Sequence, residues 1–142
     1  MRNVKFDDNN IQWNKLGDFE HILYSVLNID ELNIIIDVIF KFDPHQQIVL
    51  HRHKAHNNTF VVQGEHRLFE PNGDLKEIRA VGSYTPSPAS DEPHTECGGD
   101  EGAVVLFSIR GSAGVLYEVL DDNLNVIATL TFQDFIDLYK QQ

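Results

Sequence analysis

The chain has 142 residues, 42% of them hydrophobic and 23% charged, which is the composition of one soluble globular domain with a substantial core. Its formal net charge of -11 argues against nucleic acid and anionic membranes as partners, because both would repel it. The single cysteine, Cys97, excludes an internal disulfide and favours a reducing, cytoplasmic location.

The N-terminal third contains strand-like runs and no sign of a targeting segment. Residues 1–10 lack an apolar run, so we expect no secretory signal, and no window approaches the roughly 20 apolar residues of a membrane span. Residues 1–18 are polar and are expected to form an arm laid over a sheet. Residues 21–27 and 33–42 are rich in Ile, Val, Leu and Phe and predict two strands.

Turn signals divide the middle of the chain. We expect a turn at Gln63-Gly64, followed by a short strand over residues 65–70. The run Pro71-Asn72-Gly73-Asp74 predicts a hairpin, since Asn and Gly tolerate positive φ, and residues 75–81 form the returning strand. Gly82 then opens a loop that contains three prolines and ends at His94.

The C-terminal part completes an all-β pattern. A glycine-rich turn is expected over residues 98–102, and one amphipathic helix over residues 132–140, because its apolar residues recur at helical spacing. Eight to ten short strands with one terminal helix favour a sandwich or barrel in a single domain, residues 1–142. The remaining strands are expected over residues 103–109, 114–120 and 124–131.

Histidines are concentrated in the middle of the sequence. His51 and His53 are two residues apart in a strand-like run, so both side chains project from one face and could hold one metal ion. The alternative is a pair of polar residues at a barrel mouth. A third histidine, His94, stands behind the proline-rich loop. If it joined the pair, three neutral ligands would leave open positions on a divalent ion, as a catalytic site requires.

The run His51-Arg-His53, then Gly64, Gly82 and the proline-rich approach to His94, resembles the two motifs of the cupins. The resemblance implies a double-stranded β-helix, or jelly-roll barrel, in which these three histidines bind one metal. The subgroup that the chain resembles contains acetylacetone-cleaving and dihydroxyacetophenone dioxygenases and a zinc-binding anti-sigma factor.

Several positions depart from the cupin pattern. His45 and Ser90 stand where the first and second motifs usually have glycine. Asn57 and Asn58 occupy the positions where the first motif usually has a glutamate ligand, which the dioxygenase subgroup also lacks.

Glu70 and His56 are candidate catalytic residues. A glutamate near the position of Glu70 lies in or near the metal shell in the dioxygenase subgroup; the alternative is a surface carboxylate at a strand end. His56 could be a fourth ligand, could orient a ligand through its second nitrogen, or could be an exposed loop residue. Cys97 could supply a thiolate, although a small buried side chain is the simpler role.

The resemblance implies an Fe(II)-dependent dioxygenase that cleaves a carbon–carbon bond in a small diketone or hydroxyketone bound as an anionic chelate, with Glu70 or His56 as proton carrier. Imidazole ligands suit iron, nickel, copper and zinc, so the sequence does not select the metal. The alternative is a non-enzymatic cupin that binds or senses a metal or small ligand. A sugar-binding or isomerase cupin fits less well, because those usually retain the glutamate. Cupins commonly pair, so we expect a homodimer.

Overall fold

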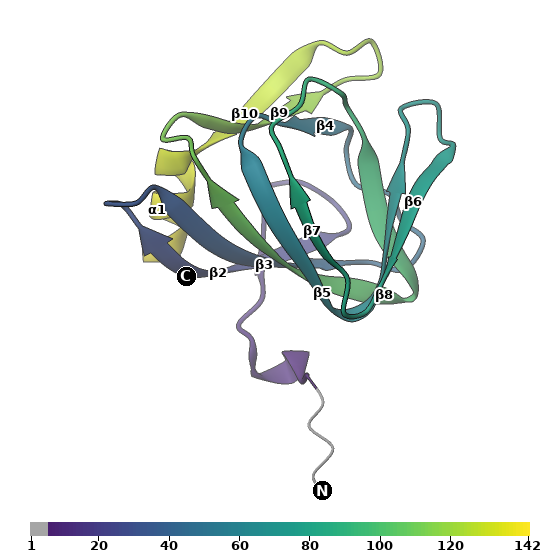
Figure 1. Cartoon of the computed structure of the whole chain (residues 1–142), viewed down its shortest axis with the longest axis horizontal. Helices are drawn as coiled ribbons and strands as arrows, with labels where there is room; N and C mark the ends of the chain where they lie inside the picture. Colours follow the sequence, from purple (N-terminus) through teal and green to yellow (C-terminus); the bar gives the residue numbers. More distant parts are fainter. Residues whose placement is uncertain (1–5) are drawn as a thin grey trace, which may run out of the picture.

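Strands with one buried face dominate the chain, as the alternating sequence predicts. The structure is a computed structural model that describes residues 6–142 (Figure 1). Its elements are η1 (Asp8–Asn10), β1 (Asn14–Lys15), β2 (Ile22–Asp30), β3 (Ile35–Phe42), β4 (His51–His53), β5 (His56–Phe69), β6 (Leu75–Ala80), β7 (Tyr84–Ser87), β8 (Thr95–Arg110), β9 (Val115–Leu120), β10 (Val126–Thr131) and α1 (Phe132–Gln141).

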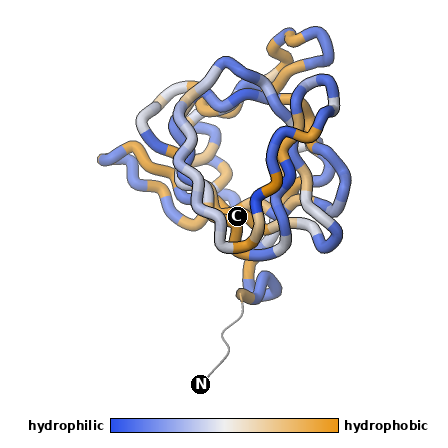
Figure 2. The backbone as a smooth tube through the Cα atoms, turned by 45° about the vertical axis from the view of Figure 1, so that its right-hand side comes forward, coloured by the Kyte–Doolittle hydropathy of each residue, from blue (hydrophilic) through white to orange (hydrophobic). Residues whose placement is uncertain are grey.

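The strands form two antiparallel sheets that close into a barrel. The larger sheet has seven strands in the order β1-β2-β3-β8-β5-β6, with β7 also paired to β5, and the smaller has the order β10-β9-β4. Viewed along the opening, the backbone forms a ring with hydrophilic segments at its loop tips (Figure 2). This arrangement confirms the predicted jelly-roll fold class. No helix within residues 6–142 is long and apolar enough to cross a membrane.

The N-terminal arm lies against the edge of the larger sheet. Residues 1–5 of the predicted arm fall outside the described residues. Asn14 and Lys15 pair with β2, so this part of the arm extends the edge of the larger sheet. Lys41 on β3 forms an ion pair with Asp8, and its ammonium lies 5.8 Å from the ring centroid of Trp13.

The predicted turns at Gln63-Gly64 and over residues 98–102 are wrong. Both segments lie inside long strands, β5 and β8, whose pairing shifts register around Gly64. Gly64 has a φ of +73°, and a Cβ there would lie 2.1 Å from the carbonyl oxygen of Gly102. The glycines therefore allow bulges and a close strand approach, which bend the sheet into a barrel without ending the strands.

The other turn predictions fit the structure better. The hairpin around Gly73, whose φ is +93°, joins β5 to β6 as predicted. The proline-rich stretch, predicted as a loop, contains the short strand β7. Beyond β7 the chain returns to the barrel interior at His94, which bridges to His51 and so connects the two sheets.

The helix predicted over residues 132–140 is confirmed as α1. Thr131 caps its N-terminus and forms a capping box with Asp134. Phe132, Phe135 and Ile136 face inward from α1 and join the core. The core also contains a group of aromatic side chains deeper in the barrel, Phe40, Phe42, Phe107 and Tyr117.

Candidate metal centre

The three predicted histidine ligands lie together inside the barrel. His51 and His53 share one face of β4, and the ring centroid of His94 lies 4.7 Å from that of His51 and 4.8 Å from that of His53. His94 is held by its backbone: its N–H donates to the carbonyl of His51 at 2.9 Å, and the N–H of His51 donates back at 3.1 Å.

A carboxylate that the sequence analysis missed completes the cluster. Glu96 lies on β8 two residues after His94 and is 2% exposed. Its Oε2 is 2.9 Å from Nε2 of His51 and 3.0 Å from Nε2 of His94. The residue spacing is the same as in the pair His51 and His53, so the same strand periodicity places the side chains of His94 and Glu96 on one face.

Burial and hydrogen bonds together set the charges in the cluster. Burial alone would raise the pKa of Glu96, but hydrogen bonds from surrounding histidines hold this pKa well below its usual range. Burial alone would lower the pKa of His51, but its interactions with Glu96 raise it. Burial, followed by the charges of neighbouring histidines, holds the pKa of His53 well below its usual value. Glu96 is therefore an ionised carboxylate, and His53 is a neutral imidazole near pH 7.

The donor atoms fit a single metal ion. One ligand atom from each of His51, His53, His94 and Glu96 lies within 4.8 Å of all the others. Ligand atoms at about 2.0–2.2 Å from one ion are about 3.3–3.6 Å apart in a tetrahedral site and up to about 4.4 Å apart when they lie on opposite sides of the ion, so the donors would move together by between a few tenths of an ångström and about 1.5 Å. Nε2 of His53 is buried and has no hydrogen-bond partner in the protein. A buried nitrogen without a partner is costly, and coordination would satisfy it.

Neighbouring groups fix the orientation of the ligands. Nδ1 of His51 is 2.8 Å from the carbonyl oxygen of Val49, which directs Nε2 toward Glu96. On the other side, Nε2 of the buried His66 is 3.1 Å from Oε1 of Glu96, and its ring stacks on Phe42 at 5.2 Å. His66 comes from β5, so three strands converge on the carboxylate.

Asn57, which stands at a usual glutamate position, has a structural role here. It is 1% exposed, its Nδ2 donates to the carbonyl of Ala55 at 2.9 Å, and its Oδ1 accepts from the hydroxyl of Tyr117 at 3.0 Å. Burial and then the charge of Glu96 raise the pKa of Tyr117 well above its usual value. Tyr117 is therefore a neutral phenol anchored beside the histidines.

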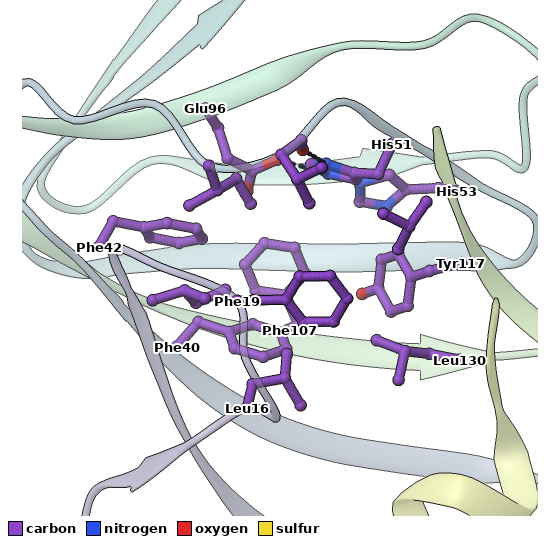
Figure 3. A pocket seen from close by; sticks show the side chains of 14 residues that line it. Leu16, Phe19, Phe40, Phe42, His51, His53, Glu96, Phe107, Tyr117 and Leu130 are labelled. Atoms are coloured by element: carbon purple, nitrogen blue, oxygen red, sulfur yellow. Dashed lines mark hydrogen bonds and ion pairs between the residues drawn. The ribbon is translucent and has the colours of Figure 1, made fainter. Parts of the chain in front are cut away.

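Two cavities of different character border the cluster, and both are lined by His53, Glu96 and Phe107. The first, of about 50 Å³, is apolar, and Figure 3 shows aromatic rings below the histidines and Tyr117 beside them. The second, of about 140 Å³, is lined mostly by polar and charged residues, among them His66 and Arg79. A ligand at the cluster would therefore meet an apolar wall on one side and a polar wall on the other.

The structure does not bring Glu70 or His56 into the cluster. Glu70 lies at the hairpin, where its backbone N–H donates to the carbonyl of Asp74 at 2.8 Å. His56 lies at the start of β5, with Nε2 2.6 Å from Oδ1 of Asn58. Neither residue lines the two cavities beside the histidines. Proton transfer by either residue stays an untested prediction.

The other unusual positions have local explanations. Cys97 is 1% exposed on β8 and lies outside the four-residue cluster, in agreement with a small buried side chain. His45 adopts a φ of +57°, so the position keeps the left-handed backbone for which glycine is usual. The imidazole of His45 contacts Asp100, with 2.7 Å between Nε2 and Oδ1. Ser90 donates its backbone N–H to the carbonyl of His53 at 2.9 Å.

The closed antiparallel barrel, with a histidine pair on β4 facing His94, is the cupin fold. Similar solved structures include an RmlC-like cupin from Ralstonia eutropha JMP134, with a TM-score of 0.74 and 19% identity over 99% of this chain and 87% of that one. An acetylacetone dioxygenase from Acinetobacter johnsonii has a TM-score of 0.70 and 16% identity over 99% of this chain and 92% of that one.

A third similar structure, a putative acetylacetone dioxygenase from Methylibium petroleiphilum PM1, has a TM-score of 0.69 and 13% identity over 98% of this chain and 95% of that one. At these identities, the similarity shows the shared fold. No protein-family model and no curated protein matches the chain.

Proposed function

We propose that the chain is a mononuclear metal-dependent dioxygenase that cleaves a carbon–carbon bond in a small diketone or hydroxyketone. The observation that carries the proposal is the largely buried cluster of His51, His53, His94 and Glu96, which borders two cavities. The similarity to two solved structures described as acetylacetone dioxygenases supports this class of reaction. When bound, a redox-active divalent ion would polarise the substrate oxygens and supply the electron chemistry that dioxygen requires.

Charge favours an anionic ligand. Glu96 would reduce the net charge of a divalent centre from two to one, compared with a centre of three neutral imidazoles. The remaining positive charge, in a largely enclosed site, would still attract an enolate or a carboxylate. The chain itself would contribute ligand positioning through Val49 and His66, and exclusion of water through the ring of Phe107.

A second candidate is a non-enzymatic module that binds zinc or a small ligand. The four-donor set supports it, because four protein ligands complete a tetrahedral zinc site, whereas a six-coordinate iron site retains two positions for substrate. The two candidates therefore differ in whether a chelating molecule can join the metal while all four protein ligands remain.

Oxygen consumption distinguishes these candidates. Protein reconstituted anaerobically with Fe(II) is mixed with a panel of β-diketones and aryl hydroxyketones, with zinc-loaded protein as the control. Iron-dependent uptake with at least one substrate supports the dioxygenase. Tight metal binding without uptake or substrate-induced spectral change would support the binding module.

We also propose a homodimer in a reducing cytoplasm. The buried free thiol of Cys97 is compatible with that compartment. Light scattering coupled to size-exclusion chromatography tests the assembly: a dimer is expected, and a monomer at micromolar concentration would refute it.

A further inference from the structure

A buried arginine in the polar cavity has unused hydrogen-bonding capacity. Arg79 lies on β6, is 9% exposed, and lines the cavity of about 140 Å³ beside the histidine cluster. Its Nη1 donates to Oγ1 of Thr59 at 3.2 Å, and its Nη2 donates to Oε2 of Glu77 at 3.1 Å. Its Nε is buried and has no acceptor in the protein. A buried guanidinium N–H without an acceptor is costly, which points to a partner from outside the chain.

The protein neutralises this guanidinium only in part. Glu77 is its only carboxylate contact within residues 6–142, and the side chain of Glu77 is 44% exposed, so water screens that interaction. Of the other charged residues that line the cavity, Lys76 and Glu92 are exposed and opposite in sign, so they largely offset each other, and Glu96 is the buried carboxylate of the histidine cluster. Arg79 is therefore the buried positive charge of this cavity's lining within residues 6–142.

The sheet places Arg79 next to the groups that hold the metal ligands. Arg79 pairs directly with His66 across β5 and β6, and residues opposite each other in an antiparallel pair project on the same face. His66 in turn contacts Glu96 of the cluster. His53, Glu96 and Arg79 therefore line one and the same cavity.

We propose that this cavity is a carboxylate subsite, in which Arg79 binds the acidic end of a ligand whose other end chelates the metal. The inference rests on the proposed metal centre for its position and narrows the proposed substrate to a carboxylate-bearing diketone or hydroxyketone. The apolar cavity, of about 50 Å³, would take the short alkyl end of the same molecule, because a cavity of about 150 Å³ is needed for a group the size of benzene. Turnover is not required for this binding.

A pair of matched ligands tests for recognition of the carboxylate, and the Arg79 variants then separate a contact with Arg79 from direct binding of the carboxylate to zinc. The probes are 2,4-dioxopentanoate and its methyl ester, which share the diketone and differ in the carboxylate charge. Their dissociation constants for zinc-loaded protein are measured by isothermal titration calorimetry. We expect wild-type protein to bind the acid about tenfold or more tightly than the ester, as a charge-assisted hydrogen bond to a buried guanidinium predicts.

The variant Arg79→Gln should lower the ratio of the two affinities toward one. Because the affinities for the acid and the ester are compared within each variant, a general loss of ligand binding lowers both and leaves their ratio unchanged. Arg110→Gln is the matched control, since Arg110 also has a buried Nε without a partner but lines neither cavity beside the histidines. It should retain the wild-type ratio. Arg79→Lys keeps the charge and should give an intermediate ratio, and it replaces Arg79→Gln if that variant does not fold.

Equal affinity of the wild-type protein for acid and ester would overturn the subsite, as would an unchanged ratio in the Arg79 variants. Metal content is measured first in every sample. If the wild-type protein holds no metal, the metal centre and the proposed dioxygenase fail. The ratio of the affinities for acid and ester, measured on metal-free protein, then tests the carboxylate subsite by itself. A preference for the acid that depends on Arg79 supports the subsite, and no preference refutes it.

Discussion

His66 is predicted to act on the metal through Glu96, without touching the metal itself. Its Nε2 is 3.1 Å from Oε1 of Glu96, and both side chains are almost completely buried. His66→Leu removes the donor while retaining an apolar contact with the ring of Phe42. Glu96 then lacks a partner for Oε1 and has more freedom to rotate away from the ligand position.

The expected loss is measurable in two ways. Removing the group that orients a metal ligand typically lowers metal affinity about 10- to 100-fold, or about 1.4–2.7 kcal/mol. In the metal-free protein, loss of a hydrogen bond to a buried carboxylate should lower the free energy of unfolding by about 1.5–3 kcal/mol. Zinc affinity is measured by competition with a chromophoric chelator, and stability is measured by urea denaturation.

His66→Gln is the matched control, because its amide N–H can still donate to Glu96 and should recover most of the zinc affinity. If His66 had a purely structural role, both variants would be less stable than the wild type, but their zinc affinities would not differ from each other. Zinc binding by His66→Leu within twofold of wild type would refute the reasoning.

Three other perturbations have defined outcomes. Gly64→Ala should cost at least about 2 kcal/mol of unfolding free energy, because of its positive φ and the close carbonyl of Gly102, whereas Gly73→Ala, with open space around it, should cost about 1 kcal/mol. Equal losses in urea denaturation would contradict the bulge argument. Thr131→Ala should cost about 1 kcal/mol by removing the cap of α1, and Thr131→Ser should restore most of it; equal melting curves for the two variants would argue against the cap. Adding zinc at 100 times its dissociation constant should stabilise the metal-free protein by about 2.7 kcal/mol, and an unchanged melting temperature would argue against native-state binding.

The proximity of His51 and His53 was predictable because the relevant physics is local. Two residues of the same strand, spaced by two, share a face whatever the rest of the barrel does. The place of His94 beside them followed from the resemblance to the cupin motifs, and the structure brings the three side chains together. The hairpin at Gly73 and the helix over residues 132–140 were predictable for the same reason, since turn chemistry and apolar periodicity act within a few residues.

The glycine-rich segment 98–102 hides Glu96 from a reading of the sequence. Because this segment predicts a turn, it masks the strand that begins at Thr95, and with it the spacing that places His94 and Glu96 on one face. Glycine in a strand and glycine in a turn look alike in a sequence. The difference arises from long-range strand pairing, here the approach of Gly64 to Gly102, which no local pattern reveals.

The roles of His66 and Arg79 depend entirely on tertiary structure. His66 was one histidine among several in the sequence, and Arg79 was one charged residue on a predicted strand. Only the pairing of β5 with β6 and β8 places them in succession behind Glu96. A buried charged side chain with an unpaired nitrogen is a property of the folded chain and has no sequence signature.

Metal stoichiometry tests the central claim most directly. Wild-type protein loaded with zinc and desalted should contain one equivalent of metal by mass spectrometry. The double substitution of His51→Ala with His53→Ala should abolish stoichiometric binding, and Glu96→Ala should weaken it while leaving the three imidazoles. Full metal content in the double variant would contradict the metal centre described here.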